Sequence, residues 1–268
     1  MTLLVGVAGL GAIGSVVCRI LDAGVPGLRL EAVASGDPVR AAARCAGFAT
    51  PPPVLSPEAL AKACDIVVDC APPQAFRSIA APALKHSRLL LTVSAAAVLE
   101  HPDLVTGAQA GQGQIQLATG ALLGLDAVRA AAEGVIHSAK LVTTKPPRSL
   151  AKARFVIDQG IDLSNLRAPL RLFAGVARDG ARAFPSNVNV AAALSLAGIG
   201  PDRTGLEIWA DPAATRNCHE VTVDADSARF TMRIENIPSD ENPASARIAA
   251  LSAVAALRRL TAPLVAGS

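Results

Sequence analysis

The 268-residue chain contains no tyrosine, one tryptophan and six phenylalanines, so aromatic residues make up only 3% of it. Its net charge is only +3, and no basic cluster has aromatic residues between its members. Proteins that bind nucleic acids usually combine a strong basic patch with exposed aromatic side chains. The composition therefore argues against nucleic acid as a partner.

Long apolar runs and long charged runs are missing as well. No stretch of about 18 apolar residues predicts a membrane-spanning helix, and the apolar N-terminus lacks the basic residues of a signal peptide. We therefore expect a cytoplasmic protein with no membrane partner. Hydrophobic residues make up 51% and charged residues 18% of the chain, which favours a folded protein with a large core over a disordered one.

The five cysteines are an odd number and form no CxxC pair; they are Cys18, Cys45, Cys64, Cys70 and Cys218. This pattern is typical of a reducing compartment and argues against a disulfide framework or a cysteine-rich zinc site. We expect most of them to be small core residues and expect no metal site.

The first part of the chain alternates between short apolar runs and segments of helical periodicity. Strands are predicted at residues 3–8, 28–34, 65–71, 89–94 and 114–119, and helices at residues 13–24 and 74–85. Such alternation indicates a parallel sheet with right-handed helical crossovers. The fold class is therefore α/β, with an N-terminal Rossmann sheet.

The pattern changes near residue 110. A helix at 120–133, a strand at 136–144, an irregular stretch at 148–169, a strand at 170–177 and a helix at 188–197 are predicted. Alternating apolar residues on both sides of residues 224–227 predict a hairpin, which is typical of an antiparallel sheet. We expect a Rossmann domain at 1–110, a second α+β domain with a mostly antiparallel sheet at 111–241, and a helix at 242–268 that returns to the first domain.

A glycine-rich turn follows the first predicted strand. Its sequence is Gly9-Leu10-Gly11-Ala12-Ile13-Gly14. The first glycine allows the tight turn, the second lets backbone approach a pyrophosphate, and the third lets helix and strand pack closely. The start of the helix offers unpaired N–H groups and a positive dipole end to that anion. We therefore predict that these residues bind a dinucleotide, either NAD or NADP.

The end of the second strand bears on the choice between the two cofactors. An acidic residue that binds the ribose hydroxyls is usual there in NAD-specific sites. Ala34 or Ser35 occupies that position, and Asp37 comes slightly late. Ser35 and Arg40 are alternatives that would accept the 2′-phosphate of NADP, although Arg40 also fits a solvated helix residue. The preference stays open.

Candidate chemistry in the second domain centres on His219. This residue shares strand parity with Val221 and Val223, so its side chain points to the covered face of the sheet, beside an irregular loop. A histidine with a pKa near 6.5 in such a place suits general acid–base catalysis, and a structural histidine is the alternative. Lys145, after a strand, is either a carboxylate-binding residue or an exposed loop charge.

The sequence resembles the L-aspartate dehydrogenase family through several separated blocks. Individually only the glycine turn is common, whereas the later blocks together are specific. The blocks are residues 9–14, 120–126 (GALLGLD), 144–147 (TKPP), 184–192 (FPSNVNVAA), 210–212 (ADP), 217–219 (NCH) and 234–243 (IENIPSDENP). In order and spacing they cover nearly the whole chain.

The resemblance implies reversible, NAD(P)-dependent oxidation of L-aspartate to iminoaspartate, which hydrolyses to oxaloacetate and ammonia and links such enzymes to NAD biosynthesis. It places the active-site histidine at His219 and the nicotinamide-side contacts at Ala121 and at either Asn187 or Asn189. It also implies a homodimer formed through the second domain. By residue chemistry alone, the two asparagines equally fit helix caps.

Two other functions remain as alternatives. A dihydrodipicolinate reductase or a homoserine dehydrogenase would share the glycine turn and the two-domain plan, but neither explains residues 184–192 together with residues 217–219. A non-catalytic NAD(P)-sensing protein would keep the Rossmann fold, because fold alone does not prove catalysis. The presence of His219, the two asparagines and Lys145 favours an enzyme.

Overall fold

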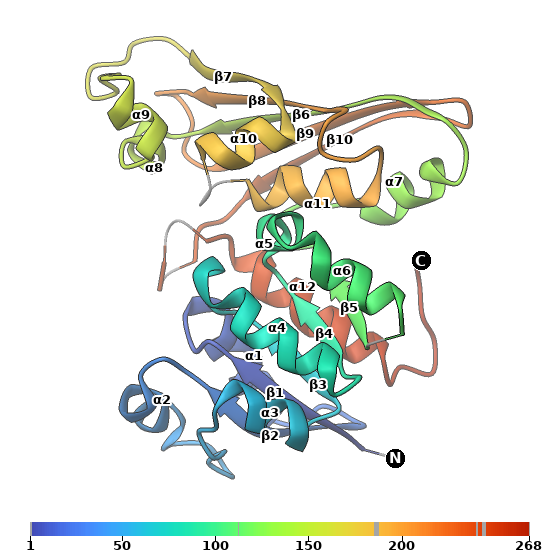
Figure 1. Cartoon of the computed structure of the whole chain (residues 1–268). Helices are drawn as coiled ribbons and strands as arrows, with labels where there is room; N and C mark the ends of the chain where they lie inside the picture. Colours follow the sequence, from blue (N-terminus) through green and yellow to red (C-terminus); the bar gives the residue numbers. More distant parts are fainter. Residues whose placement is uncertain (1, 112, 185–187, 240, 243–244, 268) are drawn as a thin grey trace. The chain divides into compact units, whose positions relative to one another are not determined.

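The structure is a computed structural model that describes residues 2–111, 113–184, 188–239, 241–242 and 245–267. It divides into two units (Figure 1). Unit 1 consists of Met1–Gly120 with Ala249–Ala266, and unit 2 consists of Ala121–Ile248 with Gly267–Ser268.

Unit 1 contains a five-stranded parallel sheet, sheet A, with the order β2-β1-β3-β4-β5. Its strands are β1 (Leu3–Ala8), β2 (Leu28–Ala34), β3 (Ile66–Asp69), β4 (Leu89–Thr92) and β5 (Gln114–Leu117). The predicted Rossmann sheet is confirmed, and the first two strands have the predicted bounds. The chain runs to opposite sides of β1, so the strand order reverses there, which is where such sheets bind their ligands.

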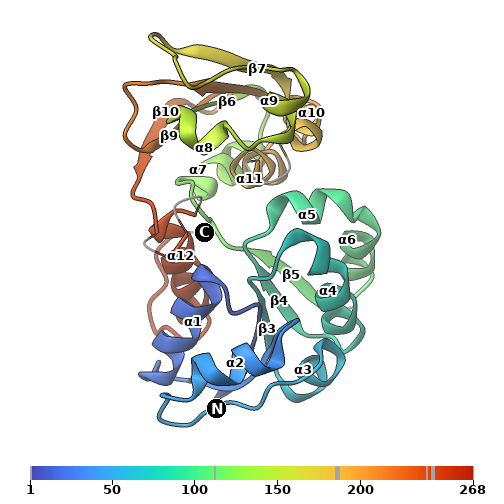
Figure 2. The same cartoon turned by 90° about the vertical axis from the view of Figure 1, so that its left-hand side faces the viewer.

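Helices cover both faces of sheet A (Figure 2). Those of unit 1 are α1 (Ala12–Asp22), α2 (Pro38–Cys45), α3 (Pro57–Ala63), the 3₁₀ turn η1 (Pro73–Ala75), α4 (Phe76–Lys85), α5 (Ala95–Glu100), α6 (Pro102–Gln109) and α12 (Arg247–Arg259). Val5 and Val7 lie in an apolar cluster with α1, α2 and α12, whereas Ala8 and Val67 lie in a second cluster with α3 to α6. The C-terminal helix therefore completes the core of unit 1.

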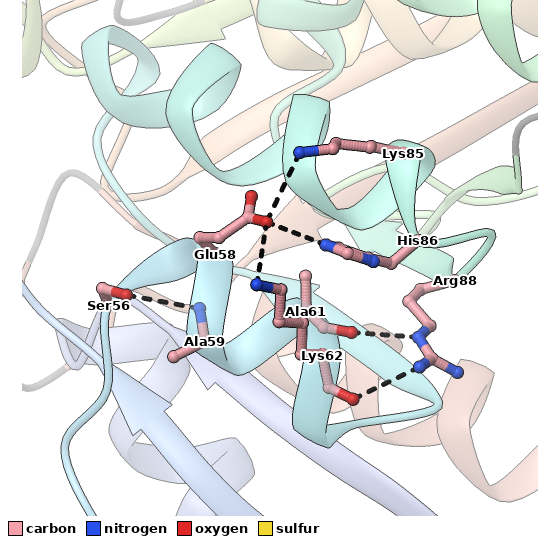
Figure 3. A network of polar contacts seen from close by, with 8 residues as sticks. All are labelled: Ser56, Glu58, Ala59, Ala61, Lys62, Lys85, His86 and Arg88. Carbon is pink, nitrogen blue, oxygen red and sulfur yellow. Dashed lines mark hydrogen bonds and ion pairs between the residues drawn. The ribbon is translucent and has the colours of Figure 1, made fainter.

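A polar network joins α3 to α4 (Figure 3). The Glu58 carboxylate is 2.9 Å from Nε2 of His86 and 3.6 Å from the Nζ atoms of both Lys62 and Lys85. The hydrogen bond to His86 holds the pKa of Glu58 below its usual range. Arg88 donates to the carbonyls of Ala61 and Lys62, which lie at the C-terminal end of α3 and lack intrahelical partners.

Unit 2 contains a mixed sheet, sheet B, with the order β10-β9-β6-β8-β7. Its strands are β6 (Ile136–Lys145), β7 (Leu170–Val176), β8 (Thr204–Ala210), β9 (Asn217–Ala225) and β10 (Arg229–Asn236). β6 and β8 are parallel, and the other neighbours are antiparallel. The predicted hairpin is β9–β10, and the mostly antiparallel second sheet is confirmed.

Helices of unit 2 lie against one face of sheet B (Figure 1). They are α7 (Leu125–Ala132), α8 (Pro147–Leu150), α9 (Arg154–Asp158), α10 (Ala177–Ala183) and α11 (Asn189–Ala197). Along β8 the residues alternate between buried and half-buried, from Thr204 to Ala210. This alternation is what a strand with one covered face requires.

Several features of the secondary structure differ from the sequence-based prediction, and the helices α2, α3, α5, α6 and α10 were not predicted. The helix predicted from residue 120 begins at Leu125, because Gly120 and Gly124 take positive φ values of 69° and 66°. The stretch 148–169, predicted as irregular, overlaps α8 and contains α9. β8 was not predicted, although Leu206, Ile208 and Ala210 alternate with more polar residues.

The last helix also begins later than predicted. Asn242 and Pro243 were expected to start it, but α12 begins at Arg247; Pro243 lies outside the described residues. The preceding chain is held in a loop in which Pro238 and Ala246 form an isolated β-bridge and Arg247 N donates to the Ile237 carbonyl. These contacts use backbone groups that an earlier helix start would need.

The sequence-based domain boundary at residue 110 precedes β5, which pairs with β4 and so belongs to sheet A. The boundary between the units therefore lies after β5, between Gly120 and Ala121.

Among the described helices, none combines the length and apolar character needed to cross a membrane. The described residues also contain no cluster of three or more His, Cys, Asp or Glu side chains arranged to hold a metal ion. All five cysteines are free, and Cys18, Cys45 and Cys64 are buried.

Candidate functional site

The glycine turn joins β1 to α1 at the carboxyl edge of sheet A. Gly9 has φ = +89°, and a Cβ atom there would lie 2.6 Å from the backbone of Ala71. A Cβ atom on Gly14 would lie 1.8 Å from the Gly9 carbonyl oxygen. Both positions therefore require glycine, one for the backbone conformation and the close approach of β3, the other for the packing of helix against turn.

Gly11 differs from its two neighbours in the motif. Its φ of −75° is open to any residue, and a Cβ atom there would meet nothing within 4 Å. Gly11 is also the N-cap of α1, with no side-chain cap, so the first N–H groups of an 11-residue helix are not capped by a side chain. Open space beside such N–H groups fits the pyrophosphate of a dinucleotide. Ala12 and Ile13 form the first turn of that helix.

The second strand ends next to this turn. Ala8 pairs with Ala34, and Gly9 N donates to the Ala34 carbonyl, so Ser35 follows β2 at the same sheet edge. The Ser35 hydroxyl accepts from Asp37 N, and the Asp37 carboxylate caps α2 by accepting from Arg40 N. An acidic side chain is therefore present near the strand end but is used as a helix cap. Arg40 is exposed.

His219 lies on the covered face of sheet B, as its strand parity predicts. It is only 3% exposed, and its Nδ1 is 3.0 Å from the Thr143 hydroxyl of β6, its register partner. Ile234 of β10 lies opposite it on the other side. No described residue forms a hydrogen bond with its Nε2, so that nitrogen is left for a ligand.

Lys145 lies on the same face, two residues beyond Thr143 on β6. Its side chain is 6% exposed, so it is not the exposed loop charge considered from the sequence. Burial lowers the pKa of Lys145 to about 8. Burial, and then the nearby Lys145 charge, lower the pKa of His219 to about 3, well below the ordinary value assumed from the sequence. At neutral pH the imidazole is therefore uncharged and the lysine mainly charged.

A third polar side chain reaches this end of the sheet from β10. Asn236 is 3% exposed, and its Nδ2 donates to the carbonyl of Ala121 at 2.9 Å. Sequence reasoning missed both Asn236 and Thr143. Strand parity would have indicated Thr143 from Lys145, and Asn236 stands in the block at 234–243 that carries the family resemblance.

The remaining expected site residues are less well defined. Asn187 lies outside the described residues. Asn189 is exposed and is the first residue of α11, whose N-cap is Val188. Ala121 is half-buried in the turn before α7. The structure thus brings His219 and Lys145 to one end of sheet B, where Asn236 binds the carbonyl of Ala121. The glycine turn and Ser35 lie at the carboxyl edge of sheet A.

The two groups of residues fit different tasks. The edge of sheet A presents open backbone and a helix start, which suit a phosphate-containing ligand. The end of sheet B combines an uncharged imidazole, which can accept a proton, with a buried cation, which can pair with a carboxylate.

Relatives of known name resemble the chain over nearly its whole length. A protein of Bradyrhizobium diazoefficiens named L-aspartate dehydrogenase is 52% identical over 99% of this chain and 94% of its own length. L-aspartate dehydrogenase 3 of Bordetella bronchiseptica is 48% identical over 98% and 97%. An L-aspartate dehydrogenase of Methanosarcina acetivorans is 37% identical over 99% and 100%.

Two family descriptions match separate parts of the chain. Residues 126–260 match "Aspartate dehydrogenase, C-terminal", and residues 9–118 match "Homoserine dehydrogenase, NAD binding domain". The glycine turn falls in the second match and His219 in the first. The N-terminal part is thus similar to more than one kind of dehydrogenase, whereas the C-terminal part separates them.

Solved structures share the fold. The aspartate dehydrogenase from Thermotoga maritima superposes with a TM-score of 0.74 at 23% identity, covering all of both chains. A homoserine dehydrogenase from Thiobacillus denitrificans gives 0.63 at 16% identity, covering 97% of this chain and 73% of that chain. These similarities agree with the two sheets and the two units observed in this chain.

Proposed function

Because the chain belongs to the L-aspartate dehydrogenase family, we propose that it oxidises L-aspartate with NAD(P) to iminoaspartate, which hydrolyses to oxaloacetate and ammonia. The reverse amination follows from the same chemistry. The observation that carries the proposal is the buried pair of His219 and Lys145 on one sheet face, within the half of the chain that matches aspartate dehydrogenases.

Gly9, Gly11, Ala12, Ile13 and Gly14 at the β1–α1 turn would hold the cofactor, and Ser35 would bind its ribose. The open space at Gly11 supports this assignment, because backbone N–H groups bind a pyrophosphate only at close range. Ala121 and an asparagine of the pair Asn187 and Asn189 contact the nicotinamide side. When bound, NAD(P) supplies the hydride acceptor.

The substrate binds at the covered end of sheet B. The Lys145 ammonium binds a substrate carboxylate through a charge-assisted hydrogen bond. His219 is uncharged at neutral pH. It uses Nε2 to accept a proton from the α-ammonium, or from the water that attacks the imine, once a substrate carboxylate offsets the Lys145 charge that helps to lower the pKa of the imidazole. Thr143 holds Nδ1 and so fixes the orientation of the ring.

The proposal is tested most directly in the amination direction. Purified protein is mixed with oxaloacetate and ammonia, with NADH or NADPH in parallel reactions, and absorbance is followed at 340 nm. We expect loss of absorbance that depends on both oxaloacetate and ammonia. The parallel reactions also decide the cofactor preference, which Asp37, used as the N-cap of α2, and the hydroxyl of Ser35 leave open.

The competing functions give different results in the same assay. A reductase or dehydrogenase of another specificity would turn over dihydrodipicolinate or homoserine in a substrate panel and leave oxaloacetate unchanged. A sensor would bind NAD(P)H, detected by nucleotide fluorescence, without turnover of any amino or oxo acid. Either result would reject the proposal.

We also propose that the protein is a cytoplasmic homodimer formed through sheet B. Among the described helices, those of unit 2 lie against the opposite face of this sheet (Figure 1). The open face carries Trp209, whose ring lies beneath Arg171 at 5.8 Å and whose Nε1 donates to Glu207. Tryptophan and arginine are enriched at interfaces between proteins, and this face therefore supports the proposed dimer.

The proposed interface is tested by light scattering. We expect twice the chain mass for the wild type and the mass of a single chain for Trp209→Glu. A variant that keeps the mass of the wild type would reject this interface.

A further inference from the structure

The side chain of Asn236 is buried but only half of it is hydrogen-bonded. Its Nδ2 donates to the Ala121 carbonyl, whereas its Oδ1 has no hydrogen-bond partner within the described part of the chain. Buried amide groups in folded proteins normally satisfy both ends. An acceptor left in this state destabilises the ligand-free protein, and a ligand that supplies a donor removes that penalty.

The hydrogen bond to Ala121 also settles which end of the amide is available. A carbonyl oxygen accepts and cannot donate, so the NH₂ group of Asn236 must face Ala121. A flipped amide would place two acceptor oxygens against each other. The free group is therefore an acceptor, and it selects ligands that carry an N–H or O–H donor.

Strand register places this acceptor with the other polar groups of the site. Asn236 pairs with Asn217, which lies two residues before His219 on β9, so both Asn236 and His219 point to the covered face. Lys145 reaches the same face from β6, on the other side of β9. The face thus offers a cation for a carboxylate, a base for a proton and an acceptor for a donor.

We infer that Oδ1 of Asn236 binds the α-amino group of the substrate, an inference that rests on the proposed function. An amino acid is the class of ligand that carries a carboxylate and, a few bonds away, an amino group with more than one N–H to donate. When one proton leaves the ammonium for His219, an N–H remains to donate to Asn236. Dicarboxylates that lack an amine gain nothing from this acceptor, so Asn236 makes the site selective for the amino acid.

The test compares two dicarboxylates that differ in the amine. KM for L-aspartate and the inhibition constant of succinate are measured on the wild type and on Asn236→Ala, with the dissociation constant of NADH measured by fluorescence. We expect Asn236→Ala to raise KM for L-aspartate by about 10- to 100-fold, the usual scale for a hydrogen bond to a charged group. The inhibition constant of succinate should change by less than about twofold, and the NADH constant reports how far the loss of the Ala121 contact affects the cofactor.

A second variant separates ligand binding from the contact with Ala121. Asn236→Asp is nearly isosteric and keeps an acceptor at the same place but lacks the N–H that donates to Ala121. It should therefore unfold at a lower temperature than the wild type, while its KM for L-aspartate lies nearer to the wild-type value than that of Asn236→Ala. Asn165→Ala, at an exposed loop residue of the same unit, serves as the control. Thermal unfolding of each variant checks that it is folded.

Three outcomes would overturn the inference. The first is an equal loss of L-aspartate and succinate binding. The second is a change confined to NADH, which would give Asn236 a role toward the cofactor and none toward the substrate. The third is a KM for L-aspartate that is raised as much in Asn236→Asp as in Asn236→Ala. That result would mean that Asn236 acts only through its hydrogen bond to Ala121. Failure of the wild type to turn over L-aspartate would instead reject the proposed function.

Discussion

His219 and Thr143 face each other across two neighbouring strands, with 3.0 Å between Nδ1 and Oγ1. A neutral imidazole has one donor and one acceptor nitrogen, and the hydroxyl can serve either role. This bond occupies Nδ1 and leaves Nε2 for the proposed contact with the substrate. The pair therefore links the register of sheet B to the orientation of the proposed base.

Removing this hydroxyl tests its orienting role. Thr143→Val keeps the shape but leaves Nδ1 buried without a partner, so we expect kcat to fall about tenfold and the free energy of unfolding to fall by about 1–3 kcal/mol. Thr143→Ser, which retains the hydroxyl, should recover most of both. Steady-state kinetics and urea unfolding provide the measurements. Equal kcat in the valine and serine variants would show that the ring needs no such support.

His219→Ala tests the proposed base itself. Loss of general acid–base catalysis is expected to lower kcat by about 100-fold or more, while the affinity for NADH stays the same. His137→Ala is a matched control, because His137 is an exposed histidine on β6 of the same sheet. The two variants are compared by initial rates at saturating substrate. Full activity of His219→Ala would remove this residue from the mechanism.

The lowered pKa of Lys145 predicts a pH limit on the binding of dicarboxylates. In the protein without substrate, Lys145 is charged below about pH 8 and loses its charge above it, while succinate stays mainly doubly charged. We therefore expect the inhibition constant of succinate to be flat below that pH and to rise as the pH increases through it, by up to about tenfold per pH unit.

Lys145→Arg provides the check on this pH limit. Arginine keeps its charge to high pH, so the rise should disappear from the accessible range even where binding is weaker. Lys152→Arg, at an exposed lysine of the same unit, should behave as the wild type. Succinate inhibition is measured from pH 6 to about pH 10 for all three proteins. An unchanged pH profile in Lys145→Arg would assign the limit to another group.

Gly11 offers a way to separate cofactor binding from folding. Its backbone conformation accepts any residue and a Cβ atom meets no neighbour within 4 Å, so Gly11→Ala should unfold at nearly the wild-type temperature. The same methyl group would occupy the space proposed for the pyrophosphate, and we expect the dissociation constant of NADH to rise about tenfold or more. Gly47→Ala, also in open space, serves as the control. Unchanged NADH affinity in Gly11→Ala would place the cofactor elsewhere.

Local patterns in the sequence were enough for much of the fold. The first two strands, the roles of Gly9 and Gly14 and the β9–β10 hairpin follow from apolar runs, backbone freedom and period-two alternation, all of which are local properties. The late start of α12 was not visible in this way, because the bridge between Pro238 and Ala246 competes with the helix start predicted at residue 242. That competition depends on contacts formed outside the helix.

The site shows the same division between local and long-range information. By itself the sequence determined that His219 faces the covered side of a strand and that a dinucleotide turn follows β1, because parity and glycine spacing are written along the chain. Only the tertiary structure decided that Thr143, Lys145 and Asn236 join His219 on one face, since that depends on the order and register of strands separated by up to about 90 residues. Burial by the assembled unit then lowers the pKa values of Lys145 and His219, and no local pattern carries the desolvation that causes this.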